Sequence, residues 1–257
     1  MKLDWQLILE LAGLSQRAYR HATWLSTATG ASFLIEHDDH SIRVAFKGSS
    51  TPKDFIEDGR FWQTRTWGGA VHTGFHDDCS SLLPQLFAGI KKRLGEHDRP
   101  LYITGHSLGG AQAPLAAETL FRQSTGRIAG VYTFGEPRVF DSHGARSYNR
   151  LLGDRTVRIA NEGDLVPHVP VPDLIFRYWH HQAKVLLRAD GGFVAGQGRA
   201  WQIIENVRKH WQARRAGKGT GLWGEIKTHH AIETYIDNIR RIASLPYEPP
   251  AKPFRLH

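Results

Sequence analysis

One serine in the sequence has neighbours that favour nucleophilic chemistry. Ser107 is the centre of Gly105-His-Ser-Leu-Gly109, a Gly-x-Ser-x-Gly pattern, and it stands between a strand-like run at 100–104 and a helical run at 108–122. In a nucleophile elbow the turn is so tight that small residues must flank the serine, which then projects from the carboxyl end of its strand. The following helix directs its free N–H groups at negative charge that develops on a reacting oxygen. The pattern therefore predicts a serine nucleophile.

A serine hydroxyl is a weak nucleophile and needs a histidine base, which a carboxylate in turn orients. In this kind of site the order along the chain is serine, then Asp or Glu, then histidine. The best downstream carboxylate is Asp164, because it follows the strand-like run 156–160 and so reaches the sheet edge at which Ser107 is expected. Glu162 is the local alternative for the acid, and a turn cap is the non-catalytic interpretation of Asp164.

The elements that must hold these residues alternate along the chain. Apolar residues recur at helical spacing over 3–20, and residues 48–70 are expected to be irregular. The other expected elements are helices at 76–94 and 108–122, and strands at 31–36, 42–46, 100–104, 128–134 and 156–160. This alternation predicts an α/β fold with a mainly parallel central sheet and helices on both faces.

Length and composition favour a single packed domain over residues 1–257. Hydrophobic residues make up 40% and charged residues 23% of the chain, which excludes wholesale disorder. Cys79 is the only cysteine, so no intrachain disulfide can form. No apolar run approaches the roughly 20 residues that span a bilayer, and polar residues interrupt the apolar start of the chain. The expected location is cytoplasmic, or exported without a recognisable signal peptide.

The positive charge is concentrated in one segment. The chain carries +8, and residues 184–227 hold nine Lys or Arg and three Asp or Glu, which gives +6. A nucleic-acid binder would spread or stripe its charge, and no nucleic-acid motif is present, so this class is excluded. Residues of about 190–228 are interpreted as a basic insertion, whose run Trp201–Arg215 has an apolar face flanked by basic residues. Such a helix suits a membrane interface, or equally the domain surface with a solvated basic edge.

Six motifs together resemble the class 3 lipase family, the fungal-lipase-like α/β-hydrolases, and the chain is similar to bacterial-type members. The motifs occur in the family's order within about residues 15–240. They are Val44–Ser50, Asp54–Asp58, Val71–Phe75, Gly105–Gly110, Phe134–Val139 and Asn161–Pro170. The resemblance implies an α/β-hydrolase fold, with Ser107 as the nucleophile and Asp164 as the acid. It also implies that Ser49 belongs to the oxyanion hole, where elbow geometry adds the backbone N–H of Leu108.

The resemblance also selects the base. In bacterial and plant members a histidine is followed by Glu-x-Tyr, with the tyrosine five residues after the histidine. His230 stands five residues before Tyr235, so His230 is the expected base. The family usually has Asp where this chain has His229, and this departure leaves His229 as an alternative base. His106, next to the nucleophile, is expected to be buried and structural.

The family places a mobile lid directly after the oxyanion residue. Here the candidate lid covers about residues 51–67, and the side chains of its expected apolar face are Phe55, Ile56, Phe61 and Trp62. Such a flap would hide an apolar acyl pocket in water and expose it at a lipid surface. The alternative is that these aromatic residues belong to the core beneath a fixed loop.

The resemblance implies a carboxylic-ester hydrolase, expected to be a lipase that acts on acylglycerols or related lipid esters through an acyl-enzyme. No metal or organic cofactor is expected, because no His, Cys or Asp cluster has a convincing ligand spacing. A phospholipase A-type esterase is the alternative within this chemistry, and a non-catalytic lipid- or membrane-binding protein is the alternative of another class. The expected partners are a lipid ester substrate and, through the basic insertion, a lipid interface, while the sequence leaves the oligomeric state open.

Overall fold

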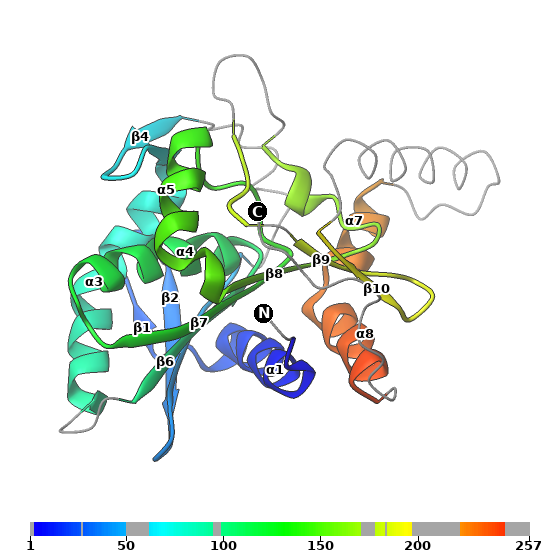
Figure 1. The fold of residues 1–257 in the computed structure, drawn as a ribbon, viewed down its shortest axis with the longest axis horizontal. Coiled ribbons are helices and arrows are strands. Elements are labelled where there is room, and N and C mark those ends of the chain that lie inside the picture. The colour runs from blue at the N-terminus through cyan, green and yellow to red at the C-terminus, as the bar shows by residue number, and fades with distance from the viewer. Residues whose placement is uncertain are drawn as a thin grey trace.

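An eight-stranded sheet forms the centre of the molecule in the computed structural model (Figure 1), which describes residues 3–26, 28–49, 62–94, 99–170, 178–182, 184–196 and 222–244. Along the sheet its strands are β1 (Trp24–Leu25), β2 (Ser32–His37), β3 (Ile42–Phe46), β6 (Pro100–His106), β7 (Arg127–Phe134), β8 (Thr156–Asn161), β9 (Lys184–Leu187) and β10 (Phe193–Ala195). Neighbouring strands from β3 to β9 are parallel. At one edge of the sheet β2 pairs antiparallel with β3 and with β1, and at the other edge β10 pairs antiparallel with β9. The predicted mainly parallel sheet is confirmed.

Helices cover both faces of this sheet. They are α1 (Trp5–His21), α3 (Thr73–Leu94), α4 (Leu108–Arg122), α5 (Ser142–Leu152), α7 (Leu222–His230) and α8 (Ile232–Ser244), with the short 3-10 turns η1 (Gly153–Arg155) and η2 (Val166–His168). Figure 1 shows α1 and α8 on one face and α3, α4 and α5 on the other. Each face has its own apolar core, and alternate residues of β3 enter the two cores: Val44 and Phe46 pack with α3 and α4, and Ala45 packs with α1 and α8. This double covering explains why the strand sequences are apolar on both sides.

The first helix illustrates how the sequence pattern determines an element. Asp4 caps its start, because the Asp4 carboxylate accepts hydrogen bonds from the backbone N–H groups of Gln6 and Leu7. The residues at helical spacing, among them Ile8 and Leu11, are fully buried against the sheet. The helix therefore forms where its apolar stripe predicted it.

Residues 48–70 were expected to be irregular, and this expectation is wrong for their last part. Residues Gln63–Arg65 form β4, which pairs antiparallel with β5 (Ala70–His72) in a separate two-stranded sheet. A three-residue strand composed of Gln, Thr and Arg, such as β4, lacks the apolar alternation by which strands are predicted. The hairpin is instead held by tertiary contacts, because Gly69 lies so close to α5 that a Cβ there would be 2.3 Å from the backbone nitrogen of Gly144.

Parts of the candidate lid and of the basic insertion lie outside the described residues. These parts include Phe55, Ile56 and Phe61, and the whole run Trp201–Arg215. Trp62, the last predicted lid residue, is described, and its side chain is 69% exposed. Within the parts of the chain that the structure covers, no helix is both long and apolar enough to cross a membrane.

Candidate active site

The turn between β6 and α4 has the geometry of a nucleophile elbow. Ser107 has φ 58° and ψ −126°, a backbone conformation that non-glycine residues rarely adopt. A Cβ at Gly105 would lie 2.1 Å from the carbonyl oxygen of Gly109, and a Cβ at Gly109 would lie 2.1 Å from that of Phe46. Both positions of the motif therefore require glycine. The Ser107 backbone N–H donates to the Phe134 carbonyl at 3.0 Å, which fixes the elbow against the end of β7.

Asp164 and His230 are in direct contact at the carboxyl edge of the sheet. Asp164 is 1% exposed, and its Oδ2 lies 2.8 Å from His230 Nδ1. The same Oδ2 accepts a hydrogen bond from Tyr235 Oη at 2.6 Å, and Oδ1 accepts one from the Val166 backbone N–H at 2.9 Å. Burial by itself would raise the pKa of Asp164, but His230 and these hydrogen bonds outweigh it and hold the pKa below its usual value. Asp164 is therefore a carboxylate that binds the ring of His230.

His230, the last residue of α7, lies between this carboxylate and the elbow. Gly135 follows Phe134 with φ 59°, and a Cβ there would lie 2.9 Å from both His230 Nδ1 and Cε1. On its other side, the ring of His106 lies 4.6 Å from the His230 ring, centroid to centroid. His230 Nε2 is buried and has no hydrogen-bond partner among the described residues. This ring nitrogen is thus not engaged by another described group.

The other candidate histidines have different surroundings. His229 is half-buried, and its ring lies against Gly163, where a Cβ would be 3.0 Å from His229 Cγ. The Asp164 hydrogen bond goes to His230 and not to His229. His168 is half-buried, and the resulting loss of solvation lowers its pKa to about 3. These positions make His230 the histidine that could serve as the base, and its catalytic role stays a prediction.

The two predicted oxyanion donors come from adjacent elements. The chain after β3 passes directly against the elbow, since a Cβ at Gly48 would lie 2.6 Å from the His106 carbonyl oxygen. Ser49 is the next residue and is half-buried. Leu108 is the first residue of α4, so its N–H belongs to the first turn, in which backbone donors have no acceptor within the helix. The arrangement suits two donors next to Ser107, and their role stays a prediction.

Sequence reasoning missed a set of polar residues that surround the Asp164–His230 pair. Tyr235 Oη accepts a hydrogen bond from the Asn161 backbone N–H at 3.0 Å while it donates to Asp164. Asn161 Oδ1 in turn accepts from Asn238 Nδ2 at 2.9 Å. One signal was present in the sequence: Asn238 is a polar residue on the buried face of α8, which is otherwise composed of Ile and Tyr. Polar groups on an apolar face are buried only with partners, which points to a network.

Glu136, from the motif Phe134–Val139, forms a second buried cluster. Its carboxylate accepts hydrogen bonds from His181 Nε2 at 2.8 Å and from Thr133 Oγ1 at 2.5 Å, and Arg158 Nε lies 3.5 Å away. Burial by itself would raise the pKa of Glu136, but His181 and Arg158 outweigh it and lower it. The ring of Tyr148 also packs on His181, at 4.5 Å between centroids. These groups bind one another, so the cluster links β7, β8 and the segment 178–182.

Among the residues that the structure describes, no group of three or more His, Cys, Asp or Glu side chains could hold a metal ion. A mainly parallel sheet that presents a serine elbow, a carboxylate and a histidine at its carboxyl edge defines an α/β-hydrolase. In agreement, a solved structure of Rhizomucor miehei triacylglyceride lipase superimposes with a TM-score of 0.66 at 23% identity, covering 74% of this chain and 82% of that one.

Comparison with known sequences gives the family. A model of the family described as "Lipase (class 3)" matches residues 43–174, just over half of the chain. This chain belongs to the class 3 lipase family. A lipase from Rhizomucor miehei is 33% identical over 159 residues, which are 58% of this chain and 43% of the relative. A secreted mono- and diacylglycerol lipase from Fusarium solani is 29% identical over 65% of this chain and 49% of the relative. The chain thus spans about half the length of these relatives.

Proposed function

We propose that this protein is a serine carboxylic-ester hydrolase, a lipase that acts on acylglycerols or related lipid esters. The observation that carries the proposal is the 2.8 Å hydrogen bond between Asp164 and His230, buried beside the elbow of Ser107. The family membership and the lipases among the relatives support the class of substrate.

The chemistry follows from the positions of these groups. Ser107 Oγ attacks the ester carbonyl carbon while His230 Nε2 takes the hydroxyl proton, and Asp164 stabilises the imidazolium that forms. The carbonyl oxygen becomes an oxyanion, to which Ser49 and the Leu108 N–H donate hydrogen bonds. His230 then protonates the departing alkoxide, which leaves an acyl-enzyme. A water molecule repeats the sequence on the acyl group and releases the carboxylic acid.

A short-chain nitrophenyl ester tests the proposal directly. Ser107→Ala should abolish its hydrolysis, with a loss of about 10⁴-fold or more in kcat. Ser80→Ala, on α3 and away from the elbow, is the matched control and should keep full activity. A folded wild-type protein that hydrolyses no ester would instead support the non-catalytic lipid- or membrane-binding protein.

A phospholipase A-type activity is the second candidate, because the basic insertion would attract phosphate headgroups. A panel of triacylglycerols, diacylglycerols and phospholipids distinguishes the two activities through their relative kcat/KM values. Preference for the phospholipid would reassign the substrate and leave the mechanism unchanged.

The basic insertion is also proposed to bring the protein to lipid interfaces. Replacing Arg208, Lys209, Arg214 and Arg215 by glutamine should weaken binding to anionic vesicles, more so at low salt, and leave hydrolysis of a soluble ester unchanged. Equal loss on both substrates would indicate that these four side chains have a structural role. Unchanged vesicle binding would indicate a solvated face without this role.

The remaining proposals concern organisation and origin. A single domain over 1–257 with a lid at about 51–67 is consistent with one sheet covered on both faces. An exported location is supported by the secreted lipase among the relatives, and cell fractionation tests it against a cytoplasmic one. Placement among bacterial-type members rests only on the spacing of His230 and Tyr235, since the relatives described above are fungal.

A further inference from the structure

The end of α7, which carries the proposed base, is held by an unusual set of side chains. The last carbonyl groups of a helix receive no hydrogen bond from an N–H group of the same helix, so other donors must satisfy them. Three consecutive carbonyl oxygens accept side-chain hydrogen bonds here: Thr228 from Thr234 Oγ1 at 2.7 Å, His229 from Asn161 Nδ2 at 3.0 Å, and His230 from His106 Nε2 at 2.6 Å. The backbone on both sides of the base is therefore attached to other elements.

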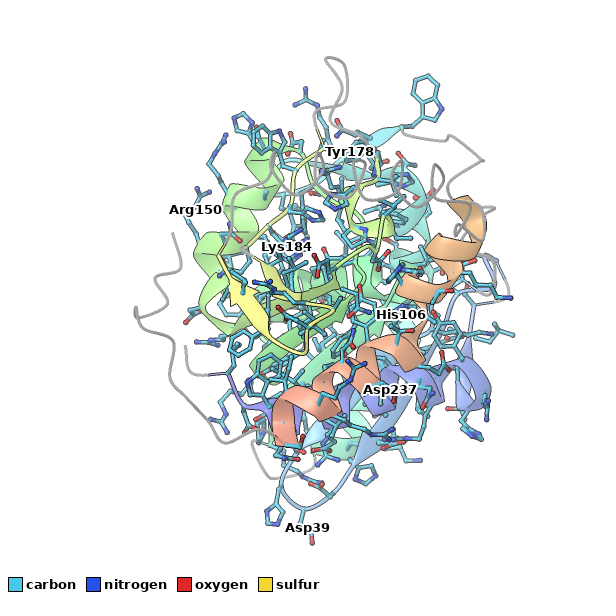
Figure 2. All side chains as sticks on the ribbon, turned by 90° about the vertical axis from the view of Figure 1, so that its right-hand side faces the viewer. Asp39, His106, Arg150, Tyr178, Lys184 and Asp237 are labelled. Atoms are coloured by element: carbon cyan, nitrogen blue, oxygen red, sulfur yellow. The ribbon has the colours of Figure 1, made fainter. Side chains whose placement is uncertain are left out.

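Two of these donors come from the elements that carry the other proposed catalytic residues. His106 directly precedes Ser107 at the end of β6, and Asn161 ends β8, three residues before Asp164. In Figure 2 His106 is labelled where the ribbons of α7 and α8 approach one another, and its ring contacts His230 and Tyr235. The His106 hydrogen bond thus connects the backbone of the proposed base to the segment that carries Ser107, and the Asn161 hydrogen bond connects it to the segment that carries Asp164.

The partners of His106 determine where its proton resides. Burial, and then the proximity of His230, lower the pKa of His106 to about 3, so the ring is neutral and has one N–H. The His230 carbonyl can only accept, so His106 Nε2 carries the hydrogen and donates it. His106 Nδ1 then accepts from Tyr19 Oη on α1, at 2.7 Å. His106 is therefore a neutral bridge between α1 and the end of α7.

We propose that His106 and Asn161 are positioning residues that set the His230 ring against Ser107 through the carbonyl groups at the end of α7. The Asp164 hydrogen bond by itself constrains one ring nitrogen but leaves the ring free to pivot about it. Fixing the backbone on both sides of His230 removes this freedom. Catalytic groups need placement within about 0.5 Å, and a displacement near 1 Å costs about 100-fold in rate. The inference rests on the proposed function.

Two amide variants of His106 separate its two hydrogen bonds. The amide nitrogen of glutamine occupies the place of Nε2, so His106→Gln keeps the donor to the His230 carbonyl and loses the contact with Tyr19. Asparagine places its amide at the position of Nδ1, so His106→Asn keeps an acceptor for Tyr19 and loses the donor to His230. Tyr19→Phe is the matched control, because it removes only the α1 side of the bridge.

On a soluble nitrophenyl ester, His106→Asn should lower kcat about 100-fold with KM unchanged, whereas His106→Gln and Tyr19→Phe should stay within about fivefold of wild type. Asn161→Asp tests the second arm: it can no longer donate to the His229 carbonyl but still accepts from Asn238, and it should behave like His106→Asn. Thermal unfolding establishes that each variant is folded. Equal kcat values for the two His106 variants, or an equal loss in Tyr19→Phe, would overturn the proposal.

A second readout does not depend on activity. The proton of the His230 Nδ1–Asp164 hydrogen bond is expected to give a far-downfield resonance in proton NMR spectra, to be recorded in the Ser107→Ala background. Added to that background, His106→Asn should broaden or shift this resonance and His106→Gln should preserve it. If the wild-type protein hydrolysed no ester, the proposed function would fail, but this measurement would still decide whether His106 positions His230. An identical resonance in both variants would refute the positioning role.

Discussion

At the scale of single residues, each polar side chain of the candidate site has a proposed role that one substitution can test. Ser49 provides a clear test, because in the proposed mechanism it donates a hydrogen bond only to the oxyanion. Ser49→Ala should fold normally, keep its KM for a soluble ester and lose about 10²–10³-fold in kcat, since one donor to the transition-state oxygen disappears. Steady-state kinetics on a nitrophenyl ester measure this. An unchanged kcat would mean that another group supplies the hydrogen bond.

The hydroxyl of Tyr235 is the second residue-scale test. Its removal in Tyr235→Phe takes one donor from Asp164 and leaves the buried N–H of Asn161 without its acceptor. The free energy of unfolding should fall by about 1–3 kcal/mol, and kcat should fall about tenfold because the pKa of Asp164 rises and its orientation loosens. Urea unfolding and kinetics check the two effects. Tyr132→Phe is the control, because it removes a hydroxyl from another buried tyrosine, which lies on β7; a similar loss there would show that the effect is general.

At the scale of elements, the ends of β6, β7 and β8 bring the site together, and the turn after β7 packs directly against the Asp164–His230 pair. Gly135→Ala places a Cβ 2.9 Å from two His230 ring atoms and 3.0 Å from Asp164 Oδ2, so the pair must separate. Activity on a soluble ester should fall at least about 100-fold. Gly30→Ala is the matched control: it has a similar φ of 74° but no atom within 4 Å of the new Cβ. Both variants carry the backbone strain, so full activity in Gly135→Ala would contradict the packing of the site.

At the scale of the whole molecule, several buried or half-buried histidines make stability depend on pH. Burial lowers the pKa of His72 to about 4 and that of His106 and His168 to about 3. In the unfolded chain the same rings have a pKa near 6.5, so below this pH the unfolded state binds more protons than the folded state. Stability is therefore complete above about pH 6.5 and is lost as the pH falls towards the folded-state values.

The size of this effect can be measured by urea unfolding at pH 8, 7, 6 and 5. Each of these three histidines contributes up to about 1.4 kcal/mol per pH unit below pH 6. Burial also lowers the pKa of His180 and His181, so the free energy of unfolding should fall by at least about 3 kcal/mol between pH 6 and pH 5. His72→Gln removes one titrating group and should reduce this slope by up to about 1.4 kcal/mol per pH unit. A free energy of unfolding that stays constant from pH 8 to pH 5 would show that these rings bind protons as readily in the folded state as in the unfolded chain.

The local sequence determined the elements whose own residues carry the pattern. The apolar stripe of α1, the strand at Ile42–Phe46 and the strand, glycine-flanked serine and helix around Ser107 are all present where they were predicted, because each depends on side-chain periodicity and turn sterics within about 20 residues. The β4–β5 hairpin was missed because both strands are short and β4 is polar, and their pairing is stabilised by contact with α5.

The partners of the site could be decided only by the tertiary structure. Two adjacent histidines have the same local sequence environment, and motif spacing alone separated His230 from His229. In the fold, α7 ends with the ring of His230 on Asp164 and that of His229 on Gly163. The bonds of His106 to His230 and of Tyr235 to Asp164 join residues 124 and 71 positions apart. Such pairs depend on how strands and helices are placed side by side, which is set by the burial of the two cores and leaves no local pattern in the chain.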